Sequence, residues 1–138
     1  MKTNFVHTSE LRVRYGETDQ LGYSYYGNYA QYFEVGRVEA LRGLGMSYKS
    51  LEDRGVMLPV SKMEVNYKGP AKYDDLLEIE TKIIEMRGAR LIFEYSVKVD
   101  GREITTGLTI LVFVGKEDMR PIHPPEDFTQ LLLPYEVK

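Results

Sequence analysis

A change in the spacing of apolar residues divides the chain and restricts its possible folds. Between Asn28 and Gly45, non-polar residues recur every three or four positions, at Tyr29, Phe33, Gly36, Ala40 and Leu44. This spacing predicts one helix whose apolar surface is wide enough to need cover on most sides. In residues 11–15 and again in residues 62–114, apolar and polar residues alternate, which is typical of half-buried strands. We therefore expect the strands to supply the cover that the helix needs.

The residues at the two ends of the helical stretch indicate where the helix begins and where it ends. Asn28 is a good N-cap residue, and Gln31 three positions later completes a capping-box pattern. Gly43 and Gly45 are expected to end the helix.

The alternating residues predict a short strand at 11–15 and longer strands at 62–68, 77–83, 91–99 and 104–114. Asp100-Gly101 is the signal for a type I′ hairpin, and Gly88 and Ala89 mark another tight connection. Consecutive strands with short turns imply an antiparallel meander. The expected fold class is α+β, with a long helix wrapped by a curved antiparallel sheet of about five strands. The last strand is apolar on both faces near its end, so we expect a second chain to cover it.

Length and composition exclude several classes of protein. The 138 residues fit a single domain, 1–138, and a net charge of −3 gives no reason to expect a nucleic-acid partner. The chain has no cysteine, which removes disulfides, thiolate metal sites and a cysteine nucleophile and fits a cytoplasmic location. The first residues lack the apolar run of a signal peptide, and no stretch has the length of a membrane span. His7 and His123 have no nearby companions, so no metal site is expected.

Familiar catalytic motifs are missing, which leaves the loop before the helix as the candidate site. Gly22-Tyr23-Ser24 lacks the closing glycine of a nucleophile elbow, and no Walker loop or GxGxxG occurs. Asp19 follows a strand end nine residues before Asn28. Free amides at the N-terminus of a helix carry partial positive charge, so a carboxylate beside them can attack or activate water while they stabilise an oxyanion. Alternatively, Asp19 is a turn residue bonded to its own backbone.

Two segments carry a resemblance to a known family. Residues 14–42, RYGETDQLGYSYYGNYAQYFEVGRVEALR, resemble the signature of the 4-hydroxybenzoyl-CoA thioesterase family of hotdog-fold proteins. Residues 65–83, VNYKGPAKYDDLLEIETKI, are similar to the second strand, proline-containing turn and third strand of that family. The similarity covers roughly residues 10 to 135. It implies a hotdog fold, a homodimer or homotetramer, and hydrolysis of acyl-CoA, in which coenzyme A is part of the substrate and no metal or redox cofactor takes part.

The resemblance also implies roles for particular residues. Asp19 matches the catalytic aspartate, and Tyr26 matches the position whose backbone amide polarises the thioester carbonyl. Many members carry histidine at that position; the amide remains available here, but no imidazole side chain does. Asp19 would act as a nucleophile that forms a mixed anhydride, or as a general base on water. The implied substrate-binding residues are Tyr15, Gly22, Tyr25, Gly27, Ser61, Lys68, Arg87 and Arg90.

Several alternatives stay open. The three cations in that set could be ordinary solvated charges, and Ser61 could be a polar edge residue. Glu34 could replace Asp19, since some hotdog enzymes place a catalytic glutamate on the helix, or it could pair with Arg37. The tyrosines near the site could select aromatic or medium-length acyl groups, or pack at a subunit interface. Hydrolysis of acyl groups on acyl carrier protein and non-catalytic acyl-CoA binding are the competing functions.

Overall fold

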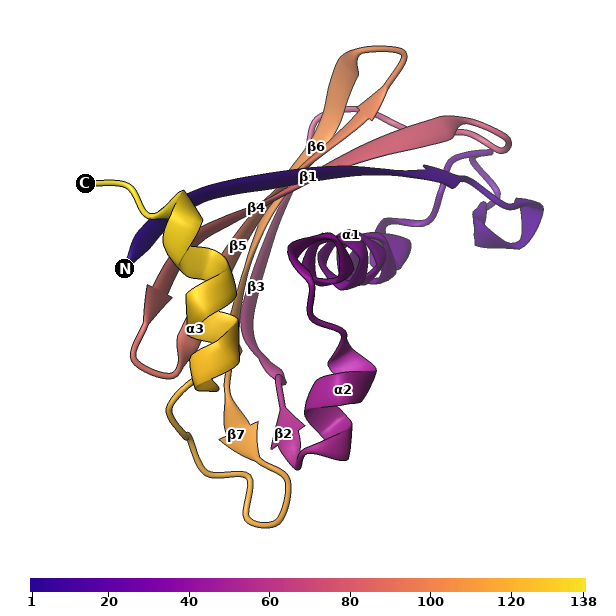
Figure 1. The fold of residues 1–138 in the computed structure, drawn as a ribbon. Coiled ribbons are helices and arrows are strands. Elements are labelled where there is room, and N and C mark those ends of the chain that lie inside the picture. Colours follow the sequence, from indigo (N-terminus) through magenta and orange to yellow (C-terminus); the bar gives the residue numbers. More distant parts are fainter.

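The computed structural model describes residues 1–138. A five-stranded antiparallel sheet curves around one long helix, which confirms the predicted α+β class (Figure 1). The sheet has the order β1-β4-β5-β6-β3 and consists of β1 (Lys2–Arg12), β3 (Val60–Tyr67), β4 (Leu76–Arg87), β5 (Arg90–Val99) and β6 (Arg102–Val112). The remaining elements are the paired β2 (Val56–Met57) and β7 (Val114–Gly115), the helices α1 (Tyr29–Leu44), α2 (Tyr48–Asp53) and α3 (Glu126–Leu132), and the 3₁₀ turns η1 (Tyr15–Glu17), η2 (Tyr26–Asn28) and η3 (Leu133–Tyr135).

The sheet is a meander only in its centre. β4, β5 and β6 follow one another, and the β5–β6 turn has positive φ at both Asp100 (50°) and Gly101 (77°), as a type I′ hairpin requires. β3 pairs with β6 and not with β4, so the predicted meander of consecutive strands was wrong for β3, and β1 pairs with β4 at the other edge. The connection between β3 and β4 spans residues 68–75, which is long enough to cross the sheet. β1 begins at Lys2 and ends at Arg12, so the strand predicted at 11–15 was wrong beyond residue 12, where the chain turns into η1.

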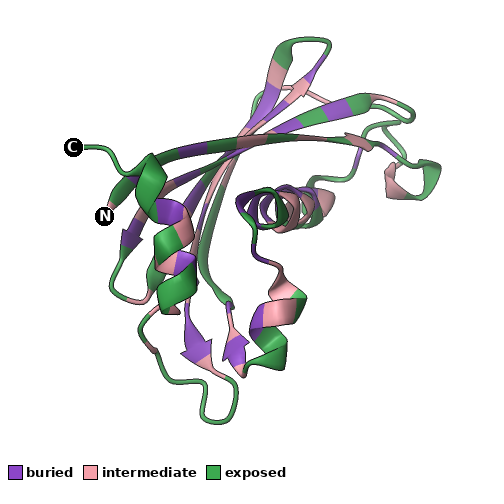
Figure 2. Ribbon diagram, in the orientation of Figure 1, coloured by how far each residue is buried: buried purple, intermediate pink, exposed green.

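The core lies between α1 and the sheet. The ring of Phe33 stacks on that of Tyr95, with centroids 4.4 Å apart, and lies over Gly107 of β6, where a Cβ atom would overlap it. Gly36 likewise brings α1 close to β4, because a Cβ there would crowd Thr81. The side of α1 that faces the sheet is buried, whereas β3 is exposed along its length (Figure 2).

Both ends of α1 differ in detail from the prediction. Gly45 ends the helix with a φ of +110°, while Gly43 lies inside the last turn. Asn28 does not cap the helix, so the predicted capping box with Gln31 was wrong. The side-chain amide of Asn28 instead donates to the carbonyl of Glu17 at 2.7 Å, and η2 places Tyr26 at the leading end of the helical segment.

The C-terminal segment closes one end of the molecule. Phe128 of α3 is buried against Phe113 with ring centroids 5.3 Å apart, and Asp127 forms an ion pair with Arg54, which directly follows α2. The two termini lie side by side (Figure 1). The amide of Val137 donates to the carbonyl of Lys2 at 2.8 Å. No helix of the structure is both long enough and apolar enough to cross a membrane.

Candidate active site

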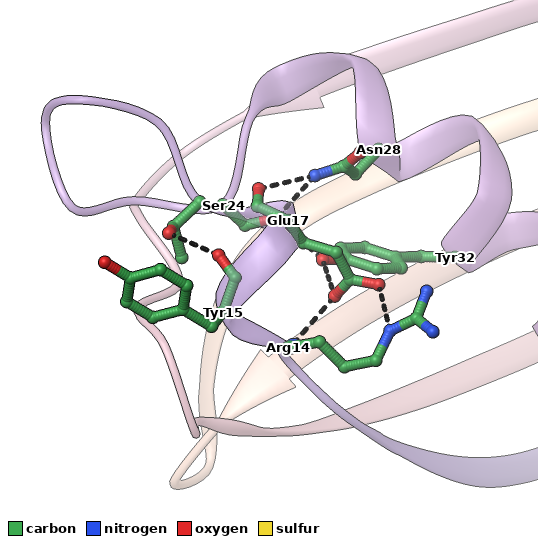
Figure 3. Close-up of polar contacts among 7 residues, drawn as sticks. Arg14, Tyr15, Glu17, Ser24, Asn28 and Tyr32 are labelled. Carbon is green, nitrogen blue, oxygen red and sulfur yellow. Dashed lines mark hydrogen bonds and ion pairs between the residues drawn. The ribbon is translucent and has the colours of Figure 1, made fainter.

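Hydrogen bonds centred on Glu17 fix the loop between β1 and α1 (Figure 3). Its carboxylate accepts hydrogen bonds from the backbone amide of Arg14 at 2.9 Å, from Arg14 Nε at 3.0 Å and from Tyr32 Oη at 3.0 Å. Burial opposes ionisation of Glu17, but the hydrogen bonds from Arg14 and Tyr32 outweigh it and lower the pKa of the carboxyl. Glu17 therefore holds the end of β1 against the first turns of α1.

The same network reaches the loop residues that precede α1. Tyr32 Oη and Ser24 Oγ share a hydrogen bond of 2.6 Å, and burial raises the pKa of Tyr32, which remains protonated. The side chain of Asn28 donates to the Glu17 carbonyl, as Figure 3 shows. Sequence reasoning did not assign these roles to Glu17, Ser24 and Tyr32. The acid two positions before Asp19 in the family signature was the one signal that pointed to Glu17.

A cavity of about 370 Å³ lies beside this loop at the leading end of α1. Tyr67 of β3 forms one wall, with its ring edge-on to Tyr26 at 6.2 Å and to Tyr29 at 5.3 Å. The lining is mostly aromatic and apolar, and Asp19 is its one acidic residue. The residues around it include Asp19, Leu21, Tyr26, Tyr29, Tyr67 and Pro70.

Asp19 is both a turn residue and a cavity residue. Its Oδ1 accepts a hydrogen bond from the amide of Leu21 at 2.9 Å, and its carbonyl accepts from Gly22 at 3.0 Å, with a φ of +80° at that glycine. The turn interpretation is therefore correct for one carboxylate oxygen. Oδ2 forms no hydrogen bond, so the second oxygen of a residue that lines the cavity is available to a ligand.

The backbone at the leading end of α1 is held in place from β3. Tyr67 Oη donates a hydrogen bond to the carbonyl of Tyr26 at 2.9 Å, which orients the peptide between Tyr26 and Gly27. In the first turn of a helix the amides have no intrahelical acceptor and carry partial positive charge. The ring of Tyr25 lies over Gly27, where a Cβ would come within 2.6 Å of it. This end of the helix can thus present N–H groups to an oxygen.

The segment between β1 and α1 holds most of the predicted site residues, and of these Asp19 and Tyr26 line the cavity. Asp19, Gly22, Tyr25, Tyr26 and Gly27 all lie between β1 and α1. Lys68 directly follows Tyr67 of the cavity wall, but its ammonium pairs with Glu103 at 2.6 Å. Tyr15 does not line the cavity: it is 76% exposed and packs edge-on against Tyr73 with centroids 5.6 Å apart.

Ser61, Arg87 and Arg90 lie at the opposite end of the sheet. Tyr67 pairs with Thr105 of β6, whereas Arg90 pairs with Val112 seven residues further along the same strand. At about 3.3 Å per residue, this separation is roughly 23 Å. Within a single protomer these three residues therefore lie far from Asp19. Arg87 pairs with Glu85, and Ser61 donates to the carbonyl of Ile110.

Glu34 and Arg37 line a second cavity of about 330 Å³, apart from Asp19. The expected Glu34–Arg37 ion pair does not form, whereas Glu39 and Arg42 do pair. No group of three or more His, Asp or Glu side chains lies close enough together to hold a metal ion.

Comparisons with known proteins agree with this architecture. A family model described as the thioesterase-like superfamily matches residues 13–132. A putative acyl-CoA thioesterase from Bacillus subtilis (strain 168) is 33% identical over 132 residues, which cover 95% of this chain and 96% of the relative. A crystal structure described as DHNA-CoA thioesterase from Staphylococcus aureus has a TM-score of 0.88 at 32% identity, over 91% of this chain and 87% of that one.

A further structure is an aspartate-to-asparagine mutant of 4-hydroxybenzoyl-CoA thioesterase complexed with 4-hydroxybenzoyl-CoA. It has a TM-score of 0.84 at 25% identity, over 93% of this chain and 99% of that one. The matches confirm the resemblance in residues 14–42 and 65–83. This chain therefore belongs to the thioesterase-like superfamily, and its fold is the hotdog fold.

Proposed function

We propose that the chain hydrolyses acyl-CoA thioesters to a free acid and coenzyme A, with Asp19 as the reacting carboxylate. The observation that carries this proposal is the cavity that Asp19 lines with one unbonded oxygen at the leading end of α1. Its relative in Bacillus subtilis carries the name acyl-CoA thioesterase. The substitution of an aspartate in the neighbour complexed with 4-hydroxybenzoyl-CoA also supports a carboxylate at the reacting centre.

The chemistry has two possible first steps. In one, Asp19 attacks the thioester carbonyl, the coenzyme A thiolate leaves, and water cleaves the resulting mixed anhydride to free acid and carboxylate. In the other, Asp19 removes a proton from water, whose hydroxyl attacks the carbonyl directly, and the coenzyme A thiolate leaves to give the free acid. In both, negative charge develops on the carbonyl oxygen, and the amides of Tyr26 and Gly27 are the groups that would stabilise it.

The same function involves a second copy of the chain. β3 is an edge strand of eight residues with nothing on its outer side, and Val60, Met63 and Tyr67 are 43%, 45% and 50% exposed. Such an edge is a template for pairing with another strand. We propose a homodimer in which two copies of β3 pair antiparallel about a twofold axis.

This pairing would bring the predicted binding residues of two protomers together. A twofold antiparallel arrangement puts the beginning of β3 in one copy next to the end of β3 in the other. Ser61, Arg87 and Arg90, which lie far from Asp19 in one protomer, would then lie at the Asp19 end of the other. Arg87 and Arg90, together with Lys68, would supply cations for the coenzyme A phosphates. Half-exposed Ile92, Ile110 and Val112, on the sheet face away from α1, are the surface on which two dimers would meet as a homotetramer.

The proposal is tested by free-thiol release from short, long and aromatic acyl-CoAs. The Asp19→Asn variant keeps the side-chain oxygen that accepts from Leu21 and should lose at least about 10²-fold in kcat. The matched control is Glu34→Gln, which removes the other candidate acid and should retain activity. Hydrolysis that survives in Asp19→Asn and disappears in Glu34→Gln would refute the assignment. Acyl-CoA binding without turnover across the panel would instead favour a binding module.

The choice between the two first steps needs an isotope experiment. A single turnover in oxygen-18 water puts label into the Asp19 carboxylate only if the anhydride forms and water attacks its aspartyl carbonyl. Label in Asp19 would show that hydrolysis does not proceed by the general-base route alone.

Whether the acyl group is carried by coenzyme A or by acyl carrier protein is tested by comparing hydrolysis of the same acyl group on each of the two carriers.

A further inference from the structure

Arg37 is a buried cation without a counter-ion. It lies on α1 and only 8% of its surface is exposed. Its Nε donates to Tyr48 Oη at 3.3 Å and its Nη1 to Tyr95 Oη at 3.4 Å. Both distances are long for hydrogen bonds of this type. No carboxylate lies within 4.0 Å of the guanidinium, although nine ion pairs form elsewhere in the chain.

This arrangement leaves most of the binding capacity of Arg37 unused. A guanidinium has five N–H donors and stays protonated, and the two tyrosine hydroxyls accept only two of them. Nη2 forms no hydrogen bond with the rest of the chain. A buried charge that lacks an opposite charge is costly, so an anion that reached Arg37 would gain a strong, charge-assisted hydrogen bond.

The cavity beside Arg37 defines the kind of anion that fits. It has a volume of about 330 Å³, at the low end for small-molecule sites. Met57, Leu58 and Pro59 supply an apolar wall next to the guanidinium. Glu34 and Glu52 also line it, and their negative charges disfavour a dianion such as phosphate. A single carboxylate on a small apolar body matches both the wall and the charge.

We propose that the cavity between α1, α2 and the β2–β3 connection is a binding site for a small monocarboxylate, held by Arg37. Two sources have this chemistry: a free organic acid, such as the product of the proposed hydrolysis, and a terminal carboxylate on an acyl group. The link to catalysis rests on the proposed function, but the binding itself does not. Asp19 lies in the other cavity, so a variant that cannot hydrolyse should still bind the acid.

The test measures thermal stability and calorimetric binding of the whole chain with hexanoate and benzoate. Hexanamide, which has the same apolar body and no charge, and inorganic phosphate are the ligand controls. We expect the two acids to raise Tm and to bind at least about tenfold more tightly than hexanamide or phosphate. Asp19→Asn should bind the acids as the wild type does, which separates this result from any failure of the proposed hydrolysis.

The diagnostic variant is Arg37→Met, with Arg42→Met as its control on the exposed face of the same helix. Because Arg37 has no carboxylate partner that its removal would leave unpaired, Arg37→Met should fold and lose at least about tenfold in acid affinity. If Arg37→Met does not fold, Arg37→Lys is the second variant. It keeps a cation and should retain part of the affinity for the acids. Unchanged acid binding in both Arg37 variants would overturn the proposal. So would a wild type that binds no acid, or an Arg37→Met chain that turns monomeric because a second copy had supplied the counter-ion.

Competition distinguishes the two sources. Free acid that competes with acyl-CoA for turnover would place the carboxylate at the far end of the acyl site, and thioesters that carry a terminal carboxylate should then lose affinity in Arg37→Met. Acid that binds without competition would identify a separate site for the free acid. Both results support a carboxylate at Arg37.

Discussion

The hydroxyl of Tyr67 offers a direct test of how the leading end of α1 is positioned. Tyr67→Phe removes one hydrogen bond, that of 2.9 Å to the carbonyl of Tyr26, and keeps the ring contacts with Tyr26 and Tyr29. A neutral hydrogen bond contributes about 0.5–1.5 kcal/mol, which corresponds to about 2- to 12-fold in a rate constant. Tyr67 is 50% exposed, so water partly replaces the bond and the lower part of this range is expected, about 2- to 5-fold.

The expected loss should appear in kcat rather than in KM. The ring of Tyr67 still forms the cavity wall in Tyr67→Phe, whereas the peptide that presents the Gly27 amide loses its anchor. Free-thiol release over a range of acyl-CoA concentrations separates the two constants. Tyr73→Phe is the matched control, because Tyr73 is also exposed and its hydroxyl has no hydrogen bond. A kcat equal to that of the wild type, or an equal loss in Tyr73→Phe, would refute the reasoning.

Three more predictions concern packing, pH and assembly. Gly107→Ala should lower the free energy of unfolding in urea by about 1–3 kcal/mol, because its Cβ overlaps Phe33, whereas Gly16→Ala faces open space and should change it by less than about 0.5 kcal/mol. The pKa of Glu17 is lower in the folded chain than in the unfolded chain, where it is near 4.5. The ionised carboxylate therefore stabilises the folded state fully above pH 4.5, and this stabilisation is lost as the pH falls through the pKa of the folded chain. The stability of the wild type should therefore fall more steeply with acid than that of Glu17→Gln. Met63→Asp puts a charge on the exposed edge strand and should reduce the molar mass measured by light scattering to that of a monomer, whereas an unchanged mass would argue against pairing through β3.

The local features of the fold could be predicted because apolar spacing is a local property. The helix and the strands after residue 60 follow from it, and the glycine at the helix end and the Asp100-Gly101 turn are equally local signals. Strand order could not be predicted, because the pairing of β3 with β6 depends on contacts between residues 38 to 51 positions apart. The wrong capping prediction has a similar cause, since the Asn28 side chain donates to the carbonyl of Glu17, eleven residues earlier in the chain.

Only part of the candidate site could be predicted, again because some of its residues are far apart in the sequence. Motif matching located Asp19 and Tyr26, which lie in one continuous loop at the cavity. It could not indicate that Ser61, Arg87 and Arg90 lie at the other end of the same sheet, because the sequence does not define the direction in which each strand crosses the molecule. Arg37 was assigned only a possible ion pair with Glu34, since burial without a counter-ion is visible only in three dimensions.

The pairing of the C-terminal segment with the beginning of β1 limits how far the sheet can grow. Thr3 bridges to Glu136, and Lys2 accepts from Val137, so this outer edge is already occupied where it begins. Further along, the same edge carries Glu10 and Arg12, charged side chains that discourage the addition of a strand. Only the opposite edge, β3, is open, and pairing about a twofold axis would cover β3 in both molecules at once. Strand addition would then stop at a closed pair instead of continuing into a fibre.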